Sequence, residues 1–160
     1  MATKQGDLSL LTDSAAQTLL QSTQPAQLAY VWPDGTPRVI PIWFHWTGQT
    51  FVFGTPPDAP KVKALTQNAK VALTINGDAW PYKVLLVRGT AQVETIDGVV
   101  PEYAAAAERY FGAEQGKGWI AQISGLMPQM TRIEVQPEWV GFLDFETRFP
   151  SAIEAAMAGQ

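Results

Sequence analysis

Lysine residues gather at the beginning of a short helix that the sequence predicts over residues 59–67. Lys61 falls in its first turn, where a cation opposes the helix dipole, and Lys63 follows closely. Asp58 is expected to cap the helix, and Pro60 suits the first turn because proline has no N–H to leave unbonded. An anion such as a phosphate, held by free amides and ammonium groups, would explain both lysines. The alternative is that both lysines are simply solvated.

The strand predicted over residues 37–46 supplies further groups. Arg38 can add a guanidinium to the same anion, and Thr55, after the next strand, can add a hydroxyl. Apolar side chains occupy both faces of residues 37–46, so we expect the core to cover one face and a partner subunit or an aromatic ligand the other. Pro41 removes a ladder hydrogen bond in mid-strand, which predicts an edge strand or a bulge with a backbone group free for a polar ring. A central strand with a tolerated kink is the alternative.

Several kinds of catalytic chemistry are excluded by what the chain lacks. It has no cysteine and one histidine, His45, so thiol nucleophiles and multi-histidine metal sites are impossible. His45 lies among aromatic residues in a strand and is expected to be structural. Neither a GxGxxG nor a GxxxxGK[ST] phosphate loop occurs, and the acidic residues do not cluster as a carboxylate metal site requires. If the protein is an enzyme, a cofactor is expected to carry the difficult chemistry.

Composition restricts the partners and the location. The net charge is −4, with 15 acidic and 11 basic residues, which argues against nucleic-acid binding. No apolar run approaches the roughly 20 residues that span a bilayer, and residues 1–7 are polar, unlike a signal peptide. We therefore expect a cytoplasmic protein that acts on a small molecule. Six tryptophans suggest aromatic surfaces beyond an ordinary core.

The order of elements predicts a mainly β (α+β) protein. Strand patterns separated by short turns favour an antiparallel barrel over a parallel sheet, and residues 1–160 are predicted to form one domain with a core over about 25–145. A helix, or two short pieces, is expected over residues 8–20, another helix over 99–111, and a glycine-punctuated stretch over 112–118 before a helical turn at 119–125. The tail at 150–160 looks loose or helical. The predicted strands cover residues 26–32, 37–46, 50–54, 70–76, 82–94 and 130–145.

Several of these segments, in this order, resemble the pyridoxamine 5'-phosphate oxidase-like FMN-binding split-barrel superfamily. Residues 35–44 fit the pattern Gly-x-Pro-x-x-x-Pro-x-x-Phe, and a short strand ending in threonine and a lysine-rich helix follow. The resemblance covers roughly residues 25–145. Its segments read Gly35-Thr36-Pro37-Arg38-Val39-Ile40-Pro41-Ile42-Trp43-Phe44, Phe53-Gly54-Thr55, Lys61-Val62-Lys63-Ala64-Leu65, Ala69-Lys70-Val71-Ala72-Leu73 and Val87-Arg88-Gly89-Thr90-Ala91.

The resemblance implies a six-stranded antiparallel split β-barrel with a few peripheral helices. It further implies a homodimer with two FMN sites at the subunit interface. Arg38 and Lys61 would bind the phosphate, with Thr55 and Lys63 in support, and the strand at 39–41 would present its backbone to the flavin ring. The residues assigned to cofactor binding are Arg38, Val39, Ile40, Pro41, Trp43, Thr55, Lys61, Val62, Lys63, Lys83 and Trp139.

The expected function is an FMN-dependent oxidoreductase that acts on a small molecule. True pyridoxamine phosphate oxidases carry an Arg-x-His motif near the C-terminus, whereas this chain has Thr147-Arg148-Phe149, which argues against vitamin B6 as the substrate. No catalytic side chain is assigned. Two alternatives stay open: a reductase that uses a deazaflavin, and a flavin-binding or dimeric interaction module without turnover.

Overall fold

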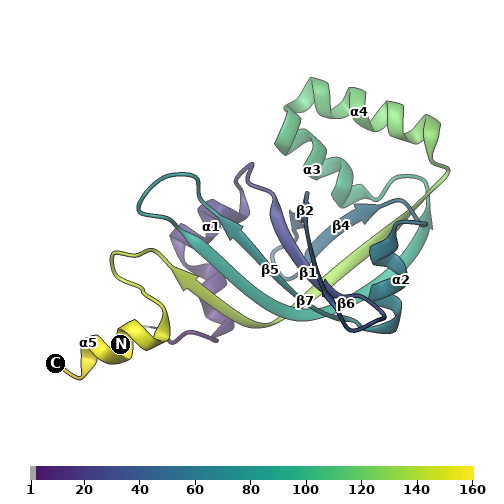
Figure 1. Cartoon of the computed structure of the whole chain (residues 1–160). Helices are drawn as coiled ribbons and strands as arrows, with labels where there is room; N and C mark the ends of the chain where they lie inside the picture. Colours follow the sequence, from purple (N-terminus) through teal and green to yellow (C-terminus); the bar gives the residue numbers. More distant parts are fainter. Residues whose placement is uncertain (1–2) are drawn as a thin grey trace.

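A computed structural model describes residues 3–160, and it is built around one antiparallel sheet (Figure 1). The seven strands follow the order β2-β1-β5-β6-β7-β4-β3. The strands are β1 (Ala26–Val31), β2 (Pro37–Ile42), β3 (His45–Trp46), β4 (Phe51–Thr55), β5 (Lys70–Asn76), β6 (Val84–Asp97) and β7 (Gln129–Leu143). The helices are the 3₁₀ helix η1 (Leu8–Thr12), α1 (Ser14–Leu20), α2 (Pro60–Gln67), α3 (Pro101–Phe111), α4 (Ala113–Leu126) and α5 (Ser151–Ala158).

The mainly β, antiparallel architecture is as predicted, whereas the six-stranded split barrel is not confirmed, because the described strands form one seven-stranded sheet. Residues 37–46 make two strands, because the chain leaves the β1 ladder after Ile42 and pairs with β4 from His45. Phe44, between them, is fully buried. β2 and β3 consequently lie at opposite ends of the strand order, and no ladder joins them within the described chain, so the sheet is open.

The long strands β6 and β7 form the central pair of the sheet and curve through the length of the molecule in Figure 1. Their register shifts once, between Arg88 and Gly89. A Cβ at Gly89 would lie 2.2 Å from the backbone oxygen of Gln136. Only glycine therefore lets the two backbones approach this closely, and the irregularity bends the ribbon where the sheet curls.

The larger of two hydrophobic clusters joins the sheet to the short helices, and a smaller one lies between β4, β7 and the helical pair. Phe51 and Phe53 of β4 are fully buried in the larger cluster, together with Leu20 of α1 and Leu65 of α2. Asp13 accepts a hydrogen bond from the Ala15 amide and caps α1. The two pieces predicted for residues 8–20 are η1 and α1. Burial of their leucines explains why these short helices are stable in the fold.

The helices α3 and α4 form a pair at one end of the sheet, whereas α5 and the C-terminus lie at the other end (Figure 1). The prediction of a glycine-punctuated stretch over residues 112–118, between two helical segments, is wrong, because α4 already begins at Ala113. A Cβ on Gly116 would lie 2.6 Å from the Glu108 Cα of α3. This glycine permits close helix packing instead of ending a helix. None of the helices in residues 3–160 combines the length and the apolar character that crossing a bilayer requires.

Candidate functional site

The strand β2 lies at an open edge of the sheet, as Pro41 predicted. It pairs with β1 alone, with Val39 opposite Ala29, so alternate backbone groups of β2 point away from the sheet. Ile40 and Ile42 pack against the core. On the other face Val39 is 65% exposed. The structure therefore shows one covered face and one face that a single chain leaves bare.

The N-terminus of α2 carries a half-buried lysine and no side-chain cap. Ala59 occupies the N-cap position, so the prediction that Asp58 caps this helix is wrong. Pro60 stands at the first helical position, as expected. Partial burial lowers the pKa of Lys61 below that of an ordinary lysine, and no carboxylate among the described residues lies within ion-pair distance of it. This end of α2 thus holds a partly desolvated cation that lacks a counter-ion.

The other residues predicted to bind phosphate lie on α2 itself or on elements near it in the fold. Arg38 is exposed on β2, with its guanidinium carbon 5.6 Å from the centre of the Trp32 ring. Thr55 ends β4 and is only 3% exposed, and a short loop leads from it to α2. Lys63 is exposed on α2. Because α2 packs against β1, and β1 pairs with β2, the helix and the Arg38 strand lie on adjacent parts of the fold.

Lys83 lies well away from α2 within one chain. It precedes β6 at the Asn76 end of β5, whereas α2 leads into the Lys70 end of that strand. The loop between β5 and β6 and the helix α2 accordingly lie on opposite sides of Figure 1. The Lys83 ammonium forms an ion pair at 3.2 Å with Glu146. One chain alone therefore does not bring Lys83 to the same cofactor as Lys61.

Trp139 is close to the bare face of β2. The Arg88 guanidinium carbon lies 4.0 Å above its ring, a cation–π contact. Trp139, Arg88 and Val39 line a common hollow of about 180 Å³ on the outer face of the sheet. Two of the residues predicted from sequence, Val39 and Trp139, are thus brought together although they are far apart in the chain.

A larger cavity lies where β2 meets the helical pair. It measures about 470 Å³, and Pro41 and Trp43 line it together with Gly54, Tyr103 and Trp119. The centre of the Trp43 ring is 5.8 Å from that of Tyr103, and the two rings are stacked. Sequence reasoning missed Tyr103 and Trp119.

A signal for part of this wall was present in the sequence. Tyr103 and Tyr110 are seven residues apart in the helix predicted over 99–111, a spacing that places both on one helix face. Tyr110 also stacks on Trp43, with ring centres 5.1 Å apart. An aromatic face on that helix could therefore have been inferred, but its contact with Trp43 could not.

Arg109 fixes the segment that carries Trp43. Its Nε donates to the backbone oxygen of Ser22 at 2.9 Å, and its Nη2 donates to that of Phe44. The guanidinium carbon also lies 4.9 Å from the centre of the Phe44 ring. A planar fork of donors suits this task, because the two acceptors come from separate segments.

We expect Arg109→Lys to lower the free energy of unfolding by about 1 kcal/mol. Lysine keeps the positive charge but cannot reach both carbonyl groups, so one of them loses a charge-assisted hydrogen bond. Urea unfolding of the two proteins measures the difference. An unchanged midpoint and slope would show that Arg109 does not hold the Phe44 segment.

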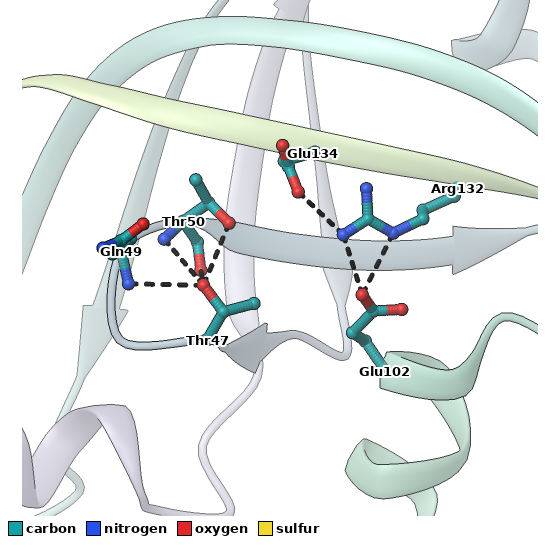
Figure 2. Close-up of polar contacts among 6 residues, drawn as sticks. All are labelled: Thr47, Gln49, Thr50, Glu102, Arg132 and Glu134. Atoms are coloured by element: carbon teal, nitrogen blue, oxygen red, sulfur yellow. Dashed lines mark hydrogen bonds and ion pairs between the residues drawn. The ribbon is translucent and has the colours of Figure 1, made fainter.

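A polar cluster lies beside the helical pair, and Figure 2 shows its hydrogen bonds. Arg132 donates through Nε and Nη2 to the Oε1 atom of Glu102, at 3.1 and 2.7 Å, and through Nη2 to Glu134 at 2.7 Å. The hydrogen bonds from Arg132 lower the pKa of Glu102 below its usual range. Burial, reinforced by the charge of Arg109, lowers the pKa of His45.

This cluster is best explained as structural. Arg132 lies between the carboxylates of Glu102 and Glu134, whose mutual repulsion its positive charge reduces, and it ties α3 to β7. Within residues 3–160 no group of histidine, aspartate and glutamate side chains has the arrangement of a metal site. The cluster therefore supports the scaffold around the aromatic cavity.

The comparison with protein families identifies the chain. The family model described as pyridoxamine 5'-phosphate oxidase matches residues 12–144, so the chain belongs to this family, and its fold is the flavin-related oxidoreductase type. The resemblance inferred from residues 35–44 and the segments after them is confirmed. No curated protein matches the chain.

Solved structures with the same fold are numerous. One is named F420 reductase: it is 25% identical, with a TM-score of 0.58, and the match covers 78% of this chain and 94% of that one. A conserved hypothetical protein from Mycobacterium tuberculosis is 19% identical, with a TM-score of 0.65 and coverage of 90% and 91%. A putative pyridoxamine 5'-phosphate oxidase from Listeria innocua is 21% identical, with a TM-score of 0.56 and coverage of 80% and 94%. The latter two show the fold alone.

Proposed function

We propose that the protein is an FMN-dependent oxidoreductase that acts on a small molecule. The observation that carries this proposal is the half-buried Lys61 at the uncapped N-terminus of α2, a cation that has no carboxylate partner within residues 3–160. A phosphate suits such a position, because it brings negative charge to free amides and an ammonium group at once. Membership of the pyridoxamine 5'-phosphate oxidase family makes a flavin phosphate the natural candidate.

The proposal assigns a role in FMN binding to each of the residues singled out above. Lys61 and Arg38 would hold the phosphate, with Thr55 and Lys63 in support. The open edge of β2 would offer backbone groups of Val39, Ile40 and Pro41 to the polar side of the ring, next to Val62 and Trp43. When bound, the flavin supplies hydride or electron transfer, and the chain supplies anchoring, orientation and an aromatic, water-poor wall.

A homodimer with the cofactor at its interface is part of the proposal. The bare face of β2 and the hollow beside it expose Val39 next to Trp139, and an apolar surface of this kind favours a protein partner. Lys83 lies too far from Lys61 to serve the same flavin within one chain. In a dimer, Lys83 and the strand around Trp139 would be offered to the flavin held mainly by the partner.

Purified protein tests the proposal directly. We expect a yellow, dimeric preparation, or a colourless one that binds added FMN, and we expect NAD(P)H to bleach the bound flavin. Absorbance spectra and size-exclusion chromatography with light scattering measure both properties. A colourless dimer that ignores FMN would overturn the oxidoreductase assignment and favour a dimeric interaction module.

A deazaflavin is the second candidate cofactor. The similar structure named F420 reductase favours it, and a deazaflavin cofactor would present its phosphate to the same basic cluster. Titration with F420 beside FMN separates the two candidates. Tighter binding of F420, together with turnover only in its presence, would make the protein a deazaflavin-dependent reductase.

We expect the affinity for FMN to decrease as the pH rises through the pKa of Lys61. Only the ammonium form attracts phosphate, and because burial lowers this pKa, the decline should begin at a lower pH than for an exposed lysine. Dissociation constants measured by flavin fluorescence from about pH 7 to about pH 10.5, the range up to the ordinary lysine pKa, follow the change. Lys61→Arg is the matched control, because arginine keeps its charge throughout. Identical profiles for the two proteins would contradict the role of Lys61.

A further inference from the structure

The aromatic cavity between β2 and the helical pair has the features of a small-molecule site. Its volume of about 470 Å³ lies in the usual range for ligand pockets. Trp43, Tyr103 and Trp119 supply flat aromatic surfaces, and none of the side chains that line the cavity is charged. A charged ligand would find no counter-ion there, so the lining selects a neutral molecule.

The hydroxyl group of Tyr103, in the wall of this cavity, can still donate a hydrogen bond. The Trp119 Nε1 group donates to the Tyr103 hydroxyl oxygen at 2.9 Å. A tyrosine hydroxyl can accept one hydrogen bond and donate another. No acceptor for the Tyr103 proton occurs among the described residues. Trp119 therefore orients a hydroxyl whose proton is available to a ligand.

The cavity adjoins the strand assigned to the flavin. Pro41 and Trp43 belong both to the proposed cofactor segment and to the cavity lining. Tyr103, whose ring stacks on Trp43, lies directly against Gly54 of β4, where a Cβ would come within 2.7 Å of the tyrosine Cβ. Glycine at this position lets α3 approach the sheet and fixes the tyrosine ring at the edge of the cavity.

We propose that this cavity binds a neutral, planar ring compound that carries a carbonyl group. The ring packs against the indoles of Trp43 and Trp119, and the carbonyl oxygen accepts the proton of the Tyr103 hydroxyl. That such compounds are the substrates of the enzyme rests on the proposed oxidoreductase function. Binding itself depends only on the cavity.

Titration calorimetry of the flavin-free protein with 1,4-naphthoquinone tests the proposal. The chain has no cysteine thiol to which a quinone could add, and at about pH 7 its lysine amines are largely protonated and therefore poor nucleophiles. Naphthalene, which has the rings but no carbonyl, is the matched ligand. We expect Tyr103→Phe to weaken naphthoquinone binding by about 2- to 10-fold, the effect of one neutral hydrogen bond, and to leave naphthalene binding unchanged.

Tyr82→Phe is the matched control variant, because Tyr82 is exposed on the loop between β5 and β6. It should bind both ligands as the parent protein does. The proposal is overturned if naphthoquinone does not bind, if Tyr103→Phe does not weaken its binding, or if both ligands are weakened equally. Failure of the protein to bind FMN or F420 would instead overturn the oxidoreductase assignment, and the two failures are distinguishable because these titrations contain no flavin.

Discussion

Lys61→Ala is expected to weaken FMN binding by about 10- to 150-fold. A charge-assisted hydrogen bond to phosphate contributes about 1.5–3 kcal/mol, and loss of one such contact gives this range. Lys61 is half-buried and has no described carboxylate partner, so its removal breaks no existing ion pair. Arg38→Ala should weaken FMN binding by a similar factor, because it would remove a second charge-assisted contact to the phosphate. Arg38 is exposed on the edge strand β2, so its removal should leave the fold intact. Quenching of flavin fluorescence on titration gives both dissociation constants.

Lys117→Ala is the matched control for these variants. Lys117 is an exposed lysine of α4, remote in the sequence from the proposed phosphate site, and its loss changes the net charge by the same amount. We expect FMN binding to be nearly unaffected, and circular dichroism should show all three variants folded. If Lys61→Ala and Arg38→Ala both bind FMN as tightly as the parent protein, these residues do not hold the phosphate.

Local sequence signals predicted most strands of the sheet, because strand formation depends largely on the pattern of neighbouring residues. Alternating apolar residues identified the strands, and Pro41 correctly indicated that β2 is an edge strand, since proline cannot donate to a second ladder. The split of residues 37–46 into β2 and β3 was not predictable in the same way. The split depends on the burial of Phe44 in the core and on the pairing of His45 with Val52 of β4. Both are contacts of the folded chain.

Glycine shows why local signals fail in the helical pair. Gly116 and Gly118 favour a loop by propensity, yet both lie inside α4. Gly116 packs against the backbone of Glu108, whereas Gly118 has no atom near its Cβ position. Glycine thus permits a close contact between helices at position 116, whereas at position 118 no packing contact requires it. Tertiary packing overrides propensity here.

For the candidate site, the sequence suggested a chemistry that stays a prediction, and it did not suggest the assembly. The types and spacing of the basic residues and of the aromatic strand led us to expect an anion and a ring. The distance between Lys83 and Lys61 follows only from the antiparallel pairing of β5 with β6, and the cavity follows only from the contact between Trp43 and α3. Such contacts join segments that are remote in the sequence, so they cannot be predicted from the periodicity within one segment.

Gly89→Ala should cause the largest loss of stability among the glycine substitutions, about 3 kcal/mol in the free energy of unfolding, as expected for severe overpacking. The added methyl group would lie 2.2 Å from the backbone oxygen of Gln136. A backbone atom in the central pair of strands cannot move aside without breaking the ladder between β6 and β7. Urea unfolding measures the change.

The matched control reverses the sign of the effect. Gly118 lies inside α4 with open space around its Cβ position, so Gly118→Ala should stabilise the protein by about 0.5–1 kcal/mol through reduced chain entropy and better helix propensity. The same change, glycine to alanine, is thus expected to destabilise at the β6–β7 register shift and to stabilise in α4. If Gly89→Ala were as stable as the parent protein, β6 and β7 could not lie as close together at this position as the structure has them. The curvature of the sheet that places β2 and β4 around the cavity would then need another cause.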